Sequence, residues 1–164
     1  MYKKIILLMS ALAITASAAE IPIVGTVASK CVITTDTAGI YGNPTIDKLS
    51  TSLSDGGIEP IVRYDVFAAN AYKAVISTPT SFSTAPTLND LVTWTGSTNV
   101  SRVSVAGMSA YDTNKRVYNN TTEFDLTIAG STWFKSSSIA TYGVGKAFPG
   151  GTYRAVVIAE CIAL

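Results

Sequence analysis

Histidine is absent from this chain of 164 residues. Its absence removes the most frequent general base of enzymes and the most frequent side-chain ligand of transition metals. Only two cysteines are present, too few for a structural zinc site built from Cys or Cys/His clusters. The serines and threonines have no histidine to activate them, and no G-x-S-x-G motif occurs. We therefore expect no catalytic residues, no metal site and no cofactor, and we do not expect an enzyme.

Charged residues are also scarce, at 14% of the chain, with 12 basic and 11 acidic side chains. No basic cluster is interleaved with aromatic residues, so nucleic acid is not an expected partner. No apolar run after residue 19 is long enough to span a membrane, and no long stretch has the apolar period of an amphipathic helix.

The first 19 residues have the organisation of a secretory signal peptide. Two lysines, Lys3 and Lys4, precede an apolar run over residues 5–14, and the segment ends on Ala16-Ser-Ala-Ala19. Removing these 19 residues from 164 leaves residues 20–164, which is 145 residues and the size of a single domain, and changes the net charge from +1 to −1. We therefore expect an exported protein with one domain.

Export bears directly on the two cysteines, Cys31 and Cys161. In an oxidising compartment they are expected to form one disulfide, with two buried free thiols as the alternative. The bond would span 161 − 31 = 130 residues. Because a disulfide holds its two Cα atoms about 4.4–6.8 Å apart, the first and last strands after the signal peptide must be neighbours or face each other.

Short β-rich runs separated by Gly, Pro, Asn and Asp recur along residues 20–164, a pattern typical of an all-β sandwich or barrel. We count roughly eight strands, of which the first covers about residues 21–35. Residues 60–69 and 72–77 are expected to pair as a hairpin through a turn at Asn70. Residues 78–86 are polar, contain two prolines and are expected to form an exposed loop.

The last strand, residues 153–164, is apolar on both faces. One face carries Tyr153, Ala155, Val157, Ala159 and Cys161, and the other carries Val156, Ile158, Ile162 and Leu164. Such a strand either lies in the centre of a sandwich or lacks a partner along its edge. Residue types alone leave both possibilities open.

Both ends of residues 20–164 carry short motifs. Residues 24–33, VGTVASKCVI, place a Gly-x-Val pair a few residues before a cysteine that an apolar residue follows. Residues 150–164, GGTYRAVVIAECIAL, open on Gly-x-Tyr and continue with alternating small and apolar residues to the last residue. These two stretches resemble the ends of bacterial fimbrial (pilin) subunits of the chaperone-usher type, and residues 64–77 are similar to the middle strands of such subunits.

This resemblance implies an immunoglobulin-like antiparallel β-sandwich that lacks one strand and is completed by donor-strand complementation. The implied donor residues are Ile21, Ile23, Gly25 and Val27. The implied wall of the acceptor groove consists of Tyr153, Ala155, Val157 and Ala159. The implied partners are neighbouring copies or other pilus subunits, a periplasmic chaperone and an outer-membrane usher. The implied location is the periplasm in transit and then the cell-surface fimbrium, with a role in adhesion.

The aromatic residues support an alternative function. Tyrosines and tryptophans are numerous enough either to line a sugar- or protein-binding patch or to fill the core and rim of a sandwich: Tyr41, Tyr64, Tyr72, Trp94, Tyr111, Tyr118 and Trp133. The alternative is therefore a self-contained secreted or periplasmic β-sandwich that binds a glycan or protein ligand.

Overall fold

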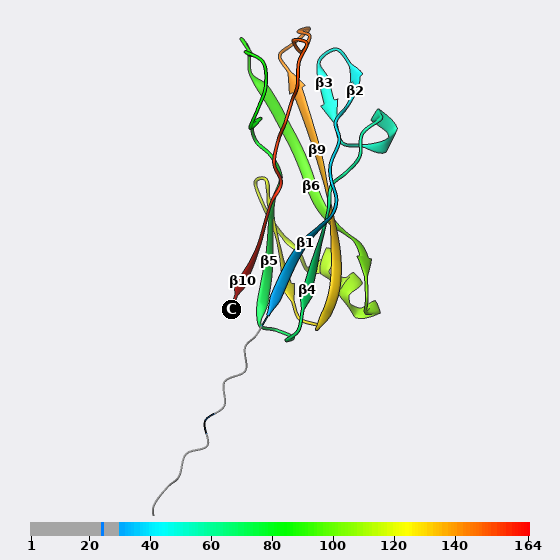
Figure 1. The fold of residues 1–164 in the computed structure, drawn as a ribbon, viewed down its shortest axis with the longest axis vertical. Helices are drawn as coiled ribbons and strands as arrows, with labels where there is room; N and C mark the ends of the chain where they lie inside the picture. Colours follow the sequence, from blue (N-terminus) through cyan, green and yellow to red (C-terminus); the bar gives the residue numbers. More distant parts are fainter. Residues whose placement is uncertain (1–23, 25–29) are drawn as a thin grey trace, which may run out of the picture.

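The computed structural model describes residues 24 and 30–164, and within them the chain forms two antiparallel sheets that pack face to face (Figure 1). The first sheet contains β1 Cys31–Thr37, β2 Gly42–Thr45, β3 Lys48–Ser50, β4 Ile61–Val66, β6 Val92–Val103 and β9 Gly130–Tyr142. The second contains β5 Tyr72–Ser77, β7 Arg116–Tyr118, β8 Thr121–Leu126 and β10 Ile158–Ala163. Three short helices complete the described part: η1 Leu53–Asp55, η2 Ala106–Ala110 and α1 Tyr111–Asn114.

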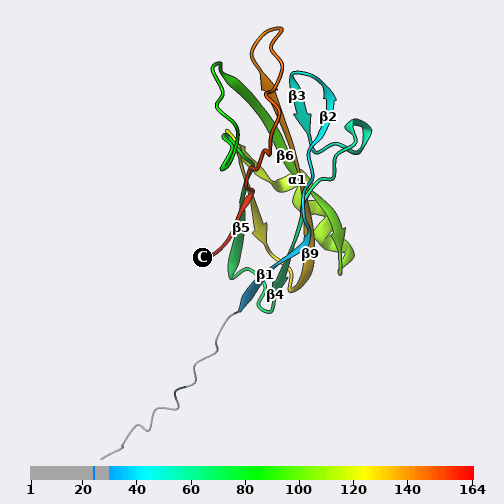
Figure 2. The ribbon, with the colours of Figure 1, turned by 45° about the horizontal axis from the view of Figure 1, so that its top comes forward.

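Strand β9 is the central strand of the first sheet. Along one edge it pairs with β4 and then, further up, with β3, while β6 pairs with its other edge. The order β1-β4-β9-β3-β2 leaves β1 at an outer edge, and the order β10-β5-β8-β7 leaves β10 at an outer edge of the second sheet. The two edge strands, β1 and β10, are therefore the first and last strands of the described chain, as Figure 2 also shows.

The core lies between the sheets and follows from the alternation of residues along the strands. In β9, every second residue from Thr132 to Tyr142 is buried, and β8 buries Thr122, Phe124 and Leu126 in the same way. The rings of Phe124 and Phe134 lie 4.4 Å apart across the two sheets. This arrangement and the disulfide between Cys31 and Cys161 confirm the expected all-β sandwich with one bridge.

The expected hairpin between residues 60–69 and 72–77 is wrong. Strand β4 pairs with β1 and β9, whereas β5 pairs with β10 and β8 in the other sheet. Asn70 does lie at a turn, with φ of 58°, but its N–H donates to Leu126 O at 3.1 Å and the turn carries the chain across the sandwich. In the second sheet, β5 lies between β10 and β8. Three successive residues of β5, Ala74 to Ile76, are buried there.

Other boundaries also differ from expectation. Ten strands are present in the described residues, where roughly eight are expected, and the longest two are β6 Val92–Val103 and β9 Gly130–Tyr142. Residues 153–157 of the expected last strand are not paired as a strand, since pairing with β5 begins at Ile158. The signal-peptide interpretation and residues 21–23 and 25–29 of the expected first strand lie outside the described residues.

Candidate functional site

A groove lies above the point where the two edge strands are joined. One wall is β1 with its continuation through Tyr41, and the other is the segment 151–159, which leads into β10. The groove has a volume of about 780 Å³. Its walls carry apolar side chains that include Ile33, Ile40, Val62, Ala155, Val157 and Ala159. This surface is therefore a large hollow whose lining is more apolar than polar.

Directly above β10, the second wall has main-chain groups for which no protein hydrogen-bond partner is found. Arg154 pairs with Thr84, and Ile158 begins the pairing with β5, but no hydrogen bond is recorded for the main chain of residues 155–157 among the described residues. Their side chains are half-buried or exposed rather than covered by another element. An extended edge with free N–H and C=O groups can accept a further strand.

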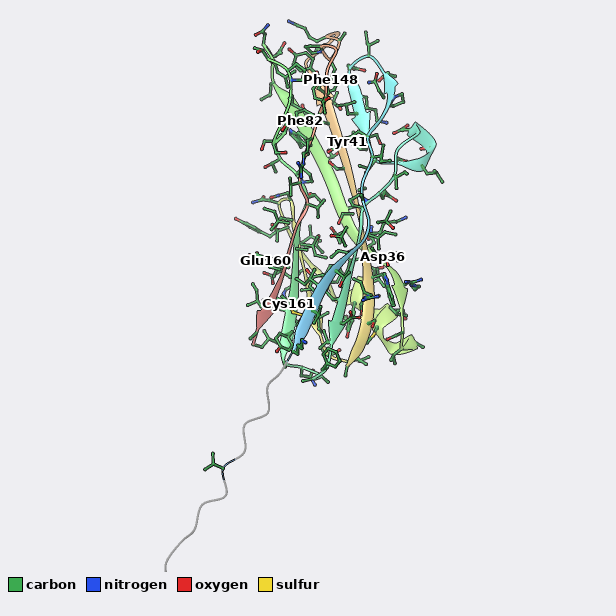
Figure 3. All side chains as sticks on the ribbon, viewed as in Figure 1. Asp36, Tyr41, Phe82, Phe148, Glu160 and Cys161 are labelled. Carbon is green, nitrogen blue, oxygen red and sulfur yellow. A yellow bond between two sulfur atoms is a disulfide. The ribbon has the colours of Figure 1, made fainter. Side chains whose placement is uncertain are left out.

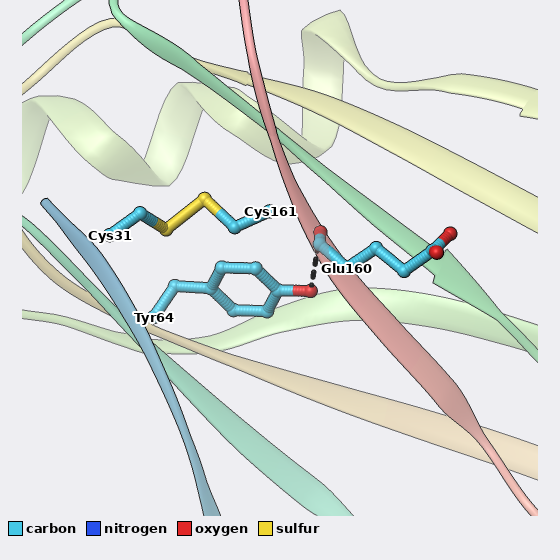
Figure 4. Close-up of a disulfide and its surroundings, with 4 residues drawn as sticks. All are labelled: Cys31, Tyr64, Glu160 and Cys161. Atoms are coloured by element: carbon cyan, nitrogen blue, oxygen red, sulfur yellow. Dashed lines mark hydrogen bonds between the residues drawn. A yellow bond between two sulfur atoms is a disulfide. The ribbon is translucent and has the colours of Figure 1, made fainter.

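The lower end of the groove is closed by the disulfide. The Cα atoms of Cys31 and Cys161 are 6.5 Å apart, and Figure 4 shows the bridge between β1 and β10. A strand inserted between two others would hold them about 9.5 Å apart, twice the usual strand spacing. No strand therefore fits between β1 and β10 at this level. The hydroxyl of Tyr64 donates to Glu160 O at 3.1 Å beside the bridge and so occupies the edge of β10 there.

The floor of the groove is partly polar. Leu49, Ser136 and Ser138 from β3 and β9 lie below it and are buried. The hydroxyls of Tyr41 and Ser138 are 2.8 Å apart, and Ser138 N–H donates to Thr51 Oγ1 at 2.9 Å. Burial raises the pKa of Tyr41 above its ordinary value, and the hydrogen bond with Ser138 opposes that rise. The hydroxyls of Tyr41, Thr51 and Ser138 are therefore hydrogen-bonded to one another or to the main chain of β9.

An aromatic cluster borders the groove through Tyr41 and Tyr153, and Figure 3 shows Tyr41, Phe82 and Phe148 in the upper region of the molecule. Phe82 is its centre, with ring centroids 4.7 Å from Trp94 and 5.1 Å from Tyr153. The centroids of Tyr41 and Phe148 lie 6.4 Å and 6.1 Å from that of Phe82. The loop 79–86 also binds the wall segment through the main chain. Ser83 N–H donates to Arg154 O at 2.7 Å, and Arg154 N–H donates to Thr84 O at 2.8 Å.

Phe82 was not expected to have a structural role, since residues 78–86 are polar and proline-containing. The signal that points to it is a single large apolar residue in an otherwise polar loop. The other aromatics divide between core and surface: Tyr64, Tyr72 and Tyr111 are buried, whereas Tyr118 is exposed on β7. Trp133 packs under Arg102, whose guanidinium carbon lies 3.8 Å from the ring centroid. The described aromatics therefore do not gather into one patch.

The residues expected in the acceptor wall are together in the structure. Tyr153, Ala155, Val157 and Ala159 all line the groove and are half-buried, and Arg154 and Val156 line it as well. The expected donor residues Ile21, Ile23, Gly25 and Val27 lie outside the described residues. Among the described residues there is no group of three or more His, Cys, Asp or Glu side chains that could hold a metal ion. In the same residues, no helix has the length and apolar character needed to cross a membrane.

Comparison of the chain with known proteins found no matching family model, no matching curated protein and no matching solved structure.

Proposed function

We propose that this chain is an exported structural subunit of a bacterial surface fibre, assembled by donor-strand complementation. In this assembly the groove between β1 and the segment 151–159 receives an extended segment from a neighbouring copy. The observation that carries the proposal is the open groove itself, with apolar walls and free main-chain groups at residues 155–157. An inserted strand would satisfy those groups and cover the apolar walls at the same time.

The segment before β1 is the proposed occupant. Residues 20–30 follow the expected signal peptide and carry apolar residues at alternate positions, Ile21, Ile23 and Val27, with Gly25 between them. Alternation with a period of two places these side chains on one face of a strand, which matches a groove that accepts side chains from one side. The groove wall from Gly151 to Ala159 spans eight residue steps, about 27 Å of extended chain. Eleven residues are enough to fill it.

The groove of the same copy is a poor destination for this segment. The chain enters the fold at the closed end of the groove, where Lys30 O accepts a hydrogen bond from Phe67 N–H at 3.2 Å. From there the segment would have to reverse direction and pass the disulfide before it reached the open part. A second copy supplies the strand without that reversal. Before assembly, a periplasmic chaperone would cover the groove and an outer-membrane usher would exchange it, and the assembled fibre would serve in adhesion.

A subunit that carries its own donor tests this proposal. The C-terminus lies at the closed end of the groove, where Leu164 N–H donates to Ala71 O at 3.0 Å. A copy of residues 20–30, added after Leu164 through a flexible linker of about twelve residues, can turn back outside the disulfide and then run antiparallel to β10 into the open part of the groove. We expect residues 20–164 alone to aggregate or polymerise without a chaperone, and the extended chain to be monomeric with a higher melting temperature.

The matched control carries Ile21→Asp and Ile23→Asp in the added copy only. This extension has the same length but would place carboxylates against the apolar walls, so it should neither raise the melting temperature nor keep the protein monomeric. A chain 20–164 that is soluble, monomeric and cooperatively folded, and that gains nothing from the unmodified extension, would reject the proposal. Such a result would leave a self-contained secreted sandwich.

A further inference from the structure

Two opposite ends of the molecule carry exposed apolar side chains. At one end, which we call the tip, Ile46, Leu91 and Val144 are 67%, 77% and 97% exposed. They come from three loops that main-chain bonds hold together, since Gly143 N–H donates to Leu91 O at 3.0 Å and Phe148 N–H donates to Ile46 O at 2.8 Å. Figure 2 shows the loops that contain these residues at the upper end of the sandwich.

The other end, which we call the base, lies beside the disulfide. Phe67 and Leu164 are 68% and 71% exposed there. Phe67 is bonded to Lys30 and Leu164 to Ala71 through the main chain, so both lie where the chain enters and leaves the fold. The C-terminus and the start of β1 are at the lower end in Figure 1.

The disulfide determines which way an inserted strand can run. Because Cys31 and Cys161 close the groove at the base, a strand that belongs to a folded neighbour can leave the groove only toward the tip. Its residue numbers must then increase from the base toward the tip, antiparallel to β10. The neighbouring domain that follows this strand is therefore placed at the tip of the copy that accepts it.

The connection between the two domains is short. If about nine of residues 20–30 occupy the groove, about two remain before Cys31 of the neighbour, and three peptide steps reach at most about 11 Å. The part of the neighbour that follows them is its base, since Cys31 begins β1 there. The tip of one copy and the base of the next are thus brought within direct contact distance.

We propose that consecutive copies pack end to end, with Ile46, Leu91 and Val144 of one copy against Phe67 and Leu164 of the next. This inference rests on the proposed function, because the inserted strand sets the order of the copies. The contact is between different surfaces and does not close on itself, so repetition gives a linear fibre. The occupant of each apolar end is a second copy of this chain, and the contact adds stiffness that an inserted strand alone would not provide.

Charge substitutions at one residue of each end test the contact in the chain 20–164. One variant carries Val144→Glu with Phe67→Glu, and the other carries Val144→Lys with Phe67→Glu. Both pairs are exposed, so folding should be unaffected. We expect the like-charged variant to associate at least about tenfold more weakly than the oppositely charged variant at low salt, as measured by sedimentation, and the difference to shrink at high salt. Equal association of the two variants would overturn the inference.

Two controls separate this contact from the inserted strand. A synthetic peptide of residues 20–30 should bind both charge variants equally, because neither position lines the groove. A pair of exposed side positions, Leu53→Glu with Tyr118→Glu, should leave association unchanged.

If the peptide binds but the charge variants associate equally, the end-to-end contact fails and the fibre proposal stands. If the peptide does not bind while the charge variants still differ, the fibre proposal fails and the contact stands. If the variant with Leu53→Glu and Tyr118→Glu associated as weakly as the like-charged variant, that result would also overturn the end-to-end contact.

Discussion

The hydroxyl of Tyr64 donates a hydrogen bond to the carbonyl oxygen of Glu160 at 3.1 Å and thereby joins the edge strand of one sheet to a central strand of the other. The ring of Tyr64 is fully buried and packs against Phe134, with centroids 5.4 Å apart. The disulfide lies beside this hydrogen bond. At the base of the groove, β10 is therefore held to the first sheet by both a covalent bond and a hydrogen bond.

Removing this hydroxyl should destabilise the fold without changing its packing. Tyr64→Phe keeps the buried ring and leaves Glu160 O without its donor, so we expect the free energy of unfolding to fall by about 0.5–1.5 kcal/mol. The measurement is urea unfolding of the self-complemented chain, which is the monomeric protein with a copy of residues 20–30 added after Leu164. Tyr118→Phe, at an exposed position, is the control and should change nothing. A loss no larger than that of the control would show that the bond to Glu160 contributes no stability.

High pH should destabilise the protein through the same residue. Burial, together with the charge of Glu160, raises the pKa of Tyr64 above its ordinary value of about 10. The folded state then retains a proton that the unfolded state loses, so the contribution is fully present below pH 10 and is lost as the pH rises above it. The unfolding free energy should fall above pH 10 by up to about 1.4 kcal/mol per pH unit for this group. Tyr64→Phe should show a shallower decline, and equal slopes would contradict the assignment.

Breaking the disulfide should lower stability substantially. The bond closes a loop of 130 residues, and loss of a native bridge typically costs about 2–5 kcal/mol. We expect Cys31→Ser, Cys161→Ser and the double variant to melt at similar, reduced temperatures, because each lacks the same single bond. The measurement is calorimetry of the self-complemented chain under non-reducing conditions. An unchanged melting temperature would mean that the bridge does not stabilise the folded protein.

A charge on the groove wall should block strand insertion. Ile33 lies on β1, lines the groove and is 36% exposed, so Ile33→Asp places a carboxylate where an apolar strand would cover it. We expect the affinity for a peptide of residues 20–30 to fall at least about tenfold in a fluorescence titration. Val117→Asp, exposed on β7 and away from the groove, is the matched control. Equal affinities for the two variants would place the peptide elsewhere.

Features set by alternation and by a covalent bond could be predicted from the sequence. The period of two at residues 153–159 agrees with the burial in the structure, where Tyr153, Ala155, Val157 and Ala159 are half-buried and the residues between them are exposed. Cys31 and Cys161 could be paired because only two cysteines exist and an exported chain favours their oxidation.

Features set by contacts between distant segments could not be predicted in this way. A turn at Asn70 is compatible with a hairpin or with a crossing between sheets, and the choice depends on which strands offer buried edges to residues 61–66 and 72–77. The role of Phe82 depends on Trp94 and Tyr153, which lie far from it in sequence. The unpaired state of residues 155–157 is likewise a property of the whole sandwich, since it depends on which other strands of the described chain lie beside this segment.

The bond between Cys31 and Cys161 also depends on the order in which the chain is made. Its second sulfur lies three residues before the last residue of the chain, and the whole second wall comes from residues 151–159. A chain in which residues 151–161 have not yet been made lacks both, whatever its earlier strands have already done. In the proposed assembly, competence to accept a strand is therefore acquired only after these residues are made, and a product truncated before residue 151 would be excluded as an acceptor.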